Sequence, residues 1–221
     1  MAGLNQQLVL IVLVIGTLFL SSLMPFDWQG RVQTIRDCLI VVWGVSLLNF
    51  VFLGGGLNRL LGVRPREPLG LLGVLFSPLV HHDLTHLIAN TLPFTLLSWL
   101  VLLQAPDRFY AITLVIAAIS GFGTWILGRT AVHVGASGII FGYFGYLLAR
   151  GYLDLTLATV GLALLALMLY GGQVGAMVPS LRETSMSWEA HLFGFLGGIW
   201  AAYSAETLSR VEQWLTQLLA S

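Results

Sequence analysis

The sequence predicts an all-α fold, a polytopic transmembrane helix bundle, and three features of its 221 residues predict it. Hydrophobic residues make up 57% of the chain, charged residues only 9%, and the mean hydropathy is +0.88. Because a soluble domain carries about 25% charged residues, most of this surface must face lipid. The ten basic residues are all arginine and are balanced by ten acids. A cytosolic globule, a disordered segment and a nucleic-acid-binding protein with a basic face are thereby excluded.

Seven apolar segments approach the length of about 20 residues that crosses a bilayer. Several contain small or polar residues, so we expect them to pack against other helices. The segments run over 8–24, 38–53, 83–107, 108–129, 129–150, 154–182 and 189–206.

The first segment, 8–24, has two interpretations, a cleaved signal peptide or a retained helix. No Lys or Arg precedes it, and its apolar run exceeds the roughly 7–15 residues of a signal peptide. The sequence that follows, Met24-Pro25-Phe26-Asp27, is not a small-x-small cleavage site. We therefore expect a retained transmembrane helix.

The longest interruption, 54–83, predicts a structured loop lying partly in the membrane surface. It contains three consecutive glycines from Gly54, together with Pro65, Pro68 and Pro78. Its apolar pieces are too short to cross the bilayer, and such re-entrant backbone is tolerated only where protein buries it.

Four polar residues open later segments and are functional candidates, because polar groups inside spans are costly. His86 and Asn90 begin the third segment, Ser137 the fifth and His191 the seventh. Alternate spans run in the same direction, so these starts emerge on one side of the membrane at similar depth. The spacing of four places His86 and Asn90 on one helical face.

Two small-residue pairs predict contact between the fifth and seventh segments. Gly138 and Gly142 are four apart, as are Gly194 and Gly198, and such faces let membrane helices approach closely. Ser137 and His191, each near the start of its segment, would then meet. An imidazole in that position can activate a serine hydroxyl. Glu189 points to a different helical face from the histidine and is a poor orienting acid, which favours a Ser–His dyad.

The remaining polar groups fit an oxyanion hole. Asn90 offers an amide NH2, His86 an imidazole N–H, and the Ser137 amide lies at a helix start where backbone N–H groups have no intrahelical partner.

Structural explanations compete with each of these interpretations. A lone membrane serine usually bonds the carbonyl four residues earlier, and glycine pairs are common packing devices. His81, His82 and His86 raise the possibility of a metal, but the pattern lacks His-Glu-x-x-His, so neither metal nor cofactor is expected. His81 is expected near the site, His82 in solvent, and His133 at the interface without a partner.

With these residues assembled, the chain resembles the rhomboid intramembrane serine proteases over roughly 54–203. The resemblance rests on His81-x4-His86-x3-Asn90, Gly135-Ala136-Ser137-Gly138 and Ala190-His191-x2-Gly194. It implies Ser137 as nucleophile, His191 as general base and acid, and an oxyanion hole of His86, Asn90 and the Ser137 amide. The supporting residues it implies are Gly135, Gly138, Phe141, Gly194 and His81.

The family has a six-helix core, which implies three regions here. Residues 1–34 would be an added N-terminal helix with its connecting loop, 35–207 the catalytic core, and 208–221 a C-terminal tail. Two positions depart from the family. Its loop Trp-Arg pair is replaced by Leu72-Gly73, which puts the loop position in question, and Phe141 replaces a Tyr that stacks on the histidine.

The resemblance implies an endopeptidase of the bacterial plasma membrane that cleaves transmembrane segments of other proteins from the extracytoplasmic side. Charge does not assign the orientation, because arginines divide five and five between the two faces. Two alternatives remain: a catalytically silent relative that binds membrane clients, and a small transporter or proton channel using the buried histidines.

Overall fold

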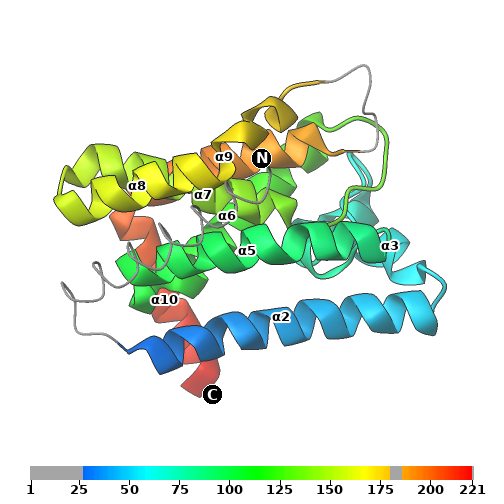
Figure 1. Cartoon of the computed structure of the whole chain (residues 1–221). Coiled ribbons are helices and arrows are strands. Elements are labelled where there is room, and N and C mark those ends of the chain that lie inside the picture. The colour runs from blue at the N-terminus through cyan, green and yellow to red at the C-terminus, as the bar shows by residue number, and fades with distance from the viewer. Residues whose placement is uncertain (1–26, 180–185, 221) are drawn as a thin grey trace, which may run out of the picture.

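The computed structural model describes residues 27–179 and 186–220, and these are nearly all helical, which confirms the predicted all-α class (Figure 1). The predicted first span, 8–24, lies outside the described residues. The α-helices are α2 (Trp28–Val51), α3 (Gly56–Leu61), α4 (Gly73–Phe76), α5 (Leu84–Gln104), α6 (Phe109–Leu127), α7 (Ser137–Asp154), α8 (Leu157–Tyr170), α9 (Trp188–Tyr203) and α10 (Ala205–Ala220). Short 3-10 helices lie between them: η1 (Pro68–Leu71), η2 (Ser77–Leu79), η3 (Pro106–Arg108) and η4 (Gly171–Met177).

The long helices run back and forth along one bundle axis. Helices α5, α7 and α9 all begin at the end drawn on the right of Figure 1, whereas α6 and α8 run back toward it. The predicted shared side of the three polar helix starts is therefore confirmed. The short helices of the 54–83 loop lie at this same end (Figure 1).

Helix α2 begins ten residues earlier than the predicted span 38–53. Asp27 caps it by accepting the Gly30 amide at 3.0 Å. The hydropathy pattern misses this start because Arg31 interrupts it. Arg31 is only 6% exposed, and its Nε donates to the Leu102 carbonyl in the last turn of α5 at 3.0 Å. A helix C-terminus is a favourable place for a cation, so this arginine stays inside the bundle, and the 34/35 region boundary falls inside α2.

Four helical stretches in the described part of the chain are long and apolar enough to cross a membrane. They are 28–51, 84–104, 106–127 and 157–177. Helices α7 and α9, with 18 and 16 residues, are not among them. Helix α7 is buried along most of its length, so a fully apolar surface is not required there. Helix α9 is shorter and exposes Leu196, Trp200 and Tyr203 on its outer face.

Helices α7 and α9 touch through backbone, as the glycine pairs predict. A Cβ on Gly194 would lie 2.0 Å from the Gly138 carbonyl oxygen, and a Cβ on Gly198 would lie 1.8 Å from that of Gly142. Any side chain at these positions would force the helices apart. The Ser120 hydroxyl of α6 also donates to the Ala190 carbonyl at 2.9 Å and fixes the start of α9.

The segment expected as a tail, 208–221, largely belongs to helix α10. Leu208 is buried against the bundle, whereas Trp214, Leu218 and Leu219 are exposed. The helix lies at the end opposite the starts of α5, α7 and α9 (Figure 1).

Candidate active site

Ser137 and His191 meet at the start of their helices. Ser137 is the first residue of α7, and its Oγ lies 2.9 Å from Nε2 of His191 in the first turn of α9. The glycine contacts described above bring these two helix starts together. The serine hydroxyl therefore does not need the local i−4 carbonyl that a lone membrane serine uses.

A backbone carbonyl orients the histidine. Nδ1 of His191 lies 2.9 Å from the carbonyl oxygen of Ala176 in η4. Since a carbonyl oxygen only accepts, Nδ1 carries the proton and Nε2 is free to accept from the serine hydroxyl. The imidazole is held from one face by Phe141, whose ring stacks on it with centroids 4.3 Å apart and planes inclined by 21°. Sequence reasoning found no orienting group, because nothing in the chain near Ala176 marks one carbonyl among many.

His86 and Asn90 of α5 face the same space. Asn90 is 9% exposed, and its Nδ2 makes no hydrogen bond within the described part of the chain. Gly135, at φ +111°, lies against both residues: a Cβ there would be 2.6 Å from Cε1 of His86 and 3.4 Å from Nδ2 of Asn90. A glycine is required here by both conformation and space.

His81 braces the residue before the serine. It is fully buried, its Nδ1 lies 3.1 Å from the Ser46 hydroxyl, and its Nε2 accepts the Ala136 amide at 3.4 Å. Burial, with His86 close by, lowers the pKa of His81 to about 3. A neutral ring is what these contacts need, because Nε2 has to keep its lone pair for the amide.

His82 is exposed and stacks on His86 with centroids 6.0 Å apart. Within the described residues, no group of three or more His, Cys, Asp or Glu side chains is arranged to hold a metal ion.

An open cavity surrounds the pair. Polar side chains from the starts of α5, α7 and α9 line it, together with Pro93 of α5, Phe141 of α7 and Tyr170 of α8. Water-accessible and apolar walls are thus combined in one space between α5 and α8. The remaining polar lining residues are His82, Asp83, Thr85, Arg129, His133, Gln173 and Ser187.

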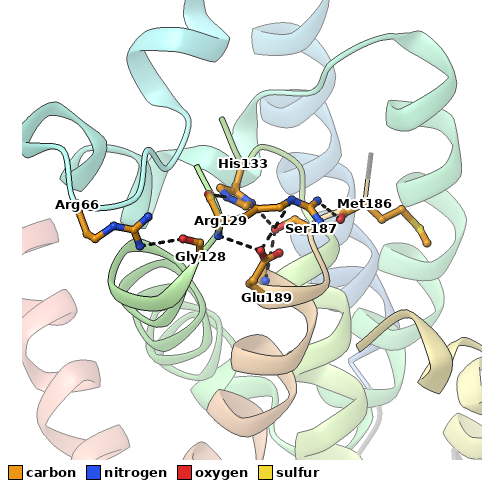
Figure 2. Close-up of polar contacts among 8 residues, drawn as sticks. Arg66, Gly128, Arg129, His133, Met186, Ser187 and Glu189 are labelled. Atoms are coloured by element: carbon orange, nitrogen blue, oxygen red, sulfur yellow. Dashed lines mark hydrogen bonds and ion pairs between the residues drawn. The ribbon is translucent and has the colours of Figure 1, made fainter. Parts of the chain in front are cut away.

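The loop 54–83 is anchored without a Trp-Arg pair. A Cβ on Gly73 would lie 2.3 Å from backbone atoms of Gly62 and Val63, so no arginine fits there. Instead the Arg66 guanidinium donates to the carbonyls of Ile126 and Gly128 at the end of α6, at 3.1 and 2.8 Å (Figure 2).

The indole of Trp125 adds a second anchor to the same loop. Its Nε1 donates to the Glu67 carbonyl at 2.8 Å, while the Arg66 amide donates to the Trp125 carbonyl at 3.0 Å. The structure thus holds the loop with an arginine and a tryptophan that are far apart in sequence.

In the described residues, α2 and α5 to α9 form a helical bundle in which the starts of α5, α7 and α9 meet beside a partly polar cavity. This is the architecture of a polytopic membrane protein. The family model for the Rhomboid domain matches residues 69–206, so the chain belongs to the rhomboid family. Together with its four apolar helices, this makes the chain an integral membrane protein.

The chain is similar to several mycobacterial proteins. An uncharacterized protein of Mycobacterium tuberculosis is 35% identical over 188 residues, which cover 77% of this chain and 78% of the relative. An uncharacterized protein of Mycobacterium bovis matches equally well, and one of Mycobacterium leprae is 31% identical over 193 residues, covering 80% of this chain and 76% of the relative.

Proposed function

We propose that this chain is an intramembrane serine endopeptidase that cleaves transmembrane segments of other membrane proteins. The observation that carries the proposal is the ordered chain of contacts from the Ala176 carbonyl through His191 to the Ser137 hydroxyl. Such an arrangement is the one an activated serine needs, because a free hydroxyl is a weak nucleophile.

In the first half-reaction, Ser137 Oγ attacks the carbonyl carbon of the scissile peptide while its proton passes to Nε2 of His191. The imidazolium that results keeps its Nδ1–H on the Ala176 carbonyl, which accepts a stronger, charge-assisted hydrogen bond. When the C–N bond breaks, His191 returns the proton to the leaving amine nitrogen. The acyl group is then esterified to Ser137.

In the second half-reaction, His191 takes a proton from water, and the resulting nucleophile attacks the ester carbonyl. The C–Oγ bond breaks, the proton returns to Ser137 and a carboxylic acid product leaves. The open polar cavity supports this step, since water has to reach a site placed within membrane helices.

The oxyanion formed in both halves would be stabilised by His86, Asn90 and the Ser137 amide. Asn90 Nδ2 supports this role, because it makes no hydrogen bond within the described residues. A buried amide donor without a partner costs free energy, which a hydrogen bond to the oxyanion would recover. Removing one such donor typically slows an enzyme by about 10²–10³-fold.

The substrate would be a membrane helix that unwinds at the site. A helical peptide bond is hydrogen-bonded and shielded, so helix-destabilising residues near the cleavage point should favour cleavage. The apolar cavity walls of α5, α7 and α8 suit such a segment. By family resemblance we place the site on the extracytoplasmic side of the plasma membrane.

The test is labelling of the reconstituted protein with a serine-directed fluorophosphonate, together with cleavage of a model transmembrane substrate. We expect both in the wild type and neither in Ser137→Ala or His191→Ala. Ser209→Ala is the matched control, since Ser209 is a partly exposed serine of α10 that does not line the cavity. Unlabelled wild-type protein that still binds membrane clients would favour a silent relative instead. Cleavage that survives in Ser137→Ala would refute the mechanism.

A further inference from the structure

A polar cluster joins the loop before Ser137 to the first turn of the helix that carries His191. It consists of Arg129 and His133 on the loop 128–136, and of Ser187 and Glu189 at the start of α9; we refer to these four residues as the α9 latch (Figure 2). The proposed chemistry uses none of them.

Glu189 is the buried carboxyl group of the latch. Its side chain is 1% exposed, and Oε1 accepts the Arg129 amide at 3.0 Å and lies 3.9 Å from Nε of the same residue. Oε2 is buried and makes no hydrogen bond within the described residues. Removing the partner of a buried carboxylate is strongly destabilising. The contact between Glu189 and Arg129 therefore holds this loop against the start of α9. Its place in the first turn of α9 also suits the helix dipole.

Arg129 contributes three groups to the latch. Besides its amide, its guanidinium donates to the Met186 carbonyl just before α9, and its own carbonyl oxygen lies 3.0 Å from Nε2 of His133 (Figure 2). The arginine therefore contacts both the α9 side and the loop side of the cluster.

His133 completes the latch in one protonation state. Because the Arg129 carbonyl only accepts, Nε2 of His133 carries the proton and Nδ1 accepts from the Ser187 hydroxyl at 2.6 Å. The same hydroxyl oxygen accepts the Ala190 amide as the helix N-cap at 3.4 Å. Protonation of Nδ1 would reverse this contact, so that Nδ1 donates to the Ser187 oxygen and the hydroxyl proton needs another acceptor. It would also place a buried cation beside Arg129.

The charged and titratable groups that face His133 are Arg129 and Glu189 in the latch and His82 across the cavity. Burial lowers the pKa of His133, and the neutral form is the stable one near neutrality. On its outer side the His133 backbone pairs with Val63 through two hydrogen bonds of 2.9 Å. The loop is thus held from both sides, by Val63 and by α9.

The latch lies close in sequence to both reacting groups: Ser137 follows His133 by four positions, and His191 follows Glu189 by two. We propose that Arg129, His133, Ser187 and Glu189 are positioning residues that hold the Ser137 hydroxyl in line with His191. This inference rests on the proposed function. It adds that the dyad's alignment depends on a carboxylate and a histidine outside the reaction itself.

The first test compares Glu189→Gln with Glu206→Gln, the same change at an exposed carboxylate paired with Arg210 in α10. A misplacement of about 1 Å can slow an enzyme by about 100-fold. We therefore expect kcat and the rate of fluorophosphonate labelling to fall by about 10- to 100-fold in Glu189→Gln, with KM near the wild-type value. Glu206→Gln should match the wild type. Equal kcat in both variants, with both folded, would overturn the proposal.

The second test does not need catalysis. Amide hydrogen exchange over residues 128–136 should speed up in Glu189→Gln and, in the wild type after correction for intrinsic rates, as the pH falls through the titration of His133. His133→Gln keeps a side-chain donor and cannot be protonated, so its exchange should lose that pH dependence. Unchanged protection in Glu189→Gln would overturn the latch. If instead protection changes but wild-type protein is neither labelled nor active, the proposed function fails and the latch survives as a structural joint.

Discussion

Gly194→Ala is the substitution that most directly links helix packing to chemistry in this protein. A Cβ at this position would lie 2.0 Å from the Gly138 carbonyl oxygen, whereas real Cβ atoms essentially never approach below 3.0 Å. The atom in the way is backbone and cannot rotate aside. Helices α7 and α9 must therefore separate by about 1 Å at this point.

That separation falls one turn from the dyad, since Gly194 follows His191 by three residues and Gly138 follows Ser137 directly. The Ser137–His191 contact of 2.9 Å would lengthen to about 4 Å, beyond hydrogen-bond reach. Misplacement by about 1 Å costs about 100-fold in rate, and overpacking a core typically costs about 1–3 kcal/mol of stability. We expect kcat to fall by about 100-fold and the protein to stay folded with a lower Tm.

The assay is cleavage of a model substrate together with fluorophosphonate labelling and thermal unfolding in detergent. Gly161→Ala in α8 is the matched control, because a Cβ there meets nothing within 4 Å. It should keep full activity and gain up to about 1 kcal/mol from the better helix propensity of alanine. If Gly194→Ala cleaves and labels within twofold of the wild type, the rigid coupling between glycine contact and dyad geometry is wrong.

Three further predictions concern the surroundings of the dyad. Asn90→Ala should lower kcat by about 10²–10³-fold, measured by substrate cleavage, with little change in Tm. A higher KM at unchanged kcat would contradict an oxyanion role. Because the folded-state pKa of His81 is about 3 and its unfolded value is about 6.5, the folded state binds fewer protons between these values. Stability should thus fall as pH drops from about 6.5 toward 3, by up to about 1.4 kcal/mol per pH unit, and His81→Asn should show a shallower decline of Tm between pH 7 and pH 5. Arg66→Ala, which frees two carbonyls at the end of α6, should increase proteolysis within 54–83 at unchanged helix content. An unaltered digestion pattern would show that the other contacts of the loop hold it without Arg66.

Within the described residues the serine pairs with a histidine that no carboxylate orients, and this arrangement has a clear physical basis. An aspartate in a serine protease fixes the imidazole tautomer and orientation. In this chain the Ala176 carbonyl fixes the tautomer, and the Phe141 ring stacked on the imidazole restricts its orientation. A neutral carbonyl achieves this without placing a further charge among membrane helices, where an ionised group is costly.

His133 shows where pattern reasoning underestimated a residue. Its sequence neighbours suggested an interface histidine without a partner, yet it is 4% exposed and contacts both Ser187 and Arg129. Those partners lie 54 and 4 residues away, and no local signal marks the first of them. Glu189 is similar: the sequence excluded it as an orienting acid for His191, and its actual partner is Arg129, 60 residues earlier.

The sequence by itself determined the class of this protein and the residues worth testing. Its lack of charge required lipid around it, and the alternation of spans required the polar starts of α5, α7 and α9 to share one end of the bundle. The glycine spacing marked which two helices touch, because small residues let the backbones of two helices approach closely. These properties depend on composition and period, which a linear pattern carries.

Tertiary structure alone decided how the site is held. The start of α2 at Trp28 depends on Arg31 reaching a carbonyl of α5, the histidine's tautomer on one carbonyl of η4, and the loop's anchorage on Arg66 meeting the end of α6. Each is a contact between groups far apart in the chain, and most of the acceptors are backbone carbonyls. Since every residue carries the same carbonyl, the sequence does not mark which one a distant side chain will meet; packing of the helices selects it.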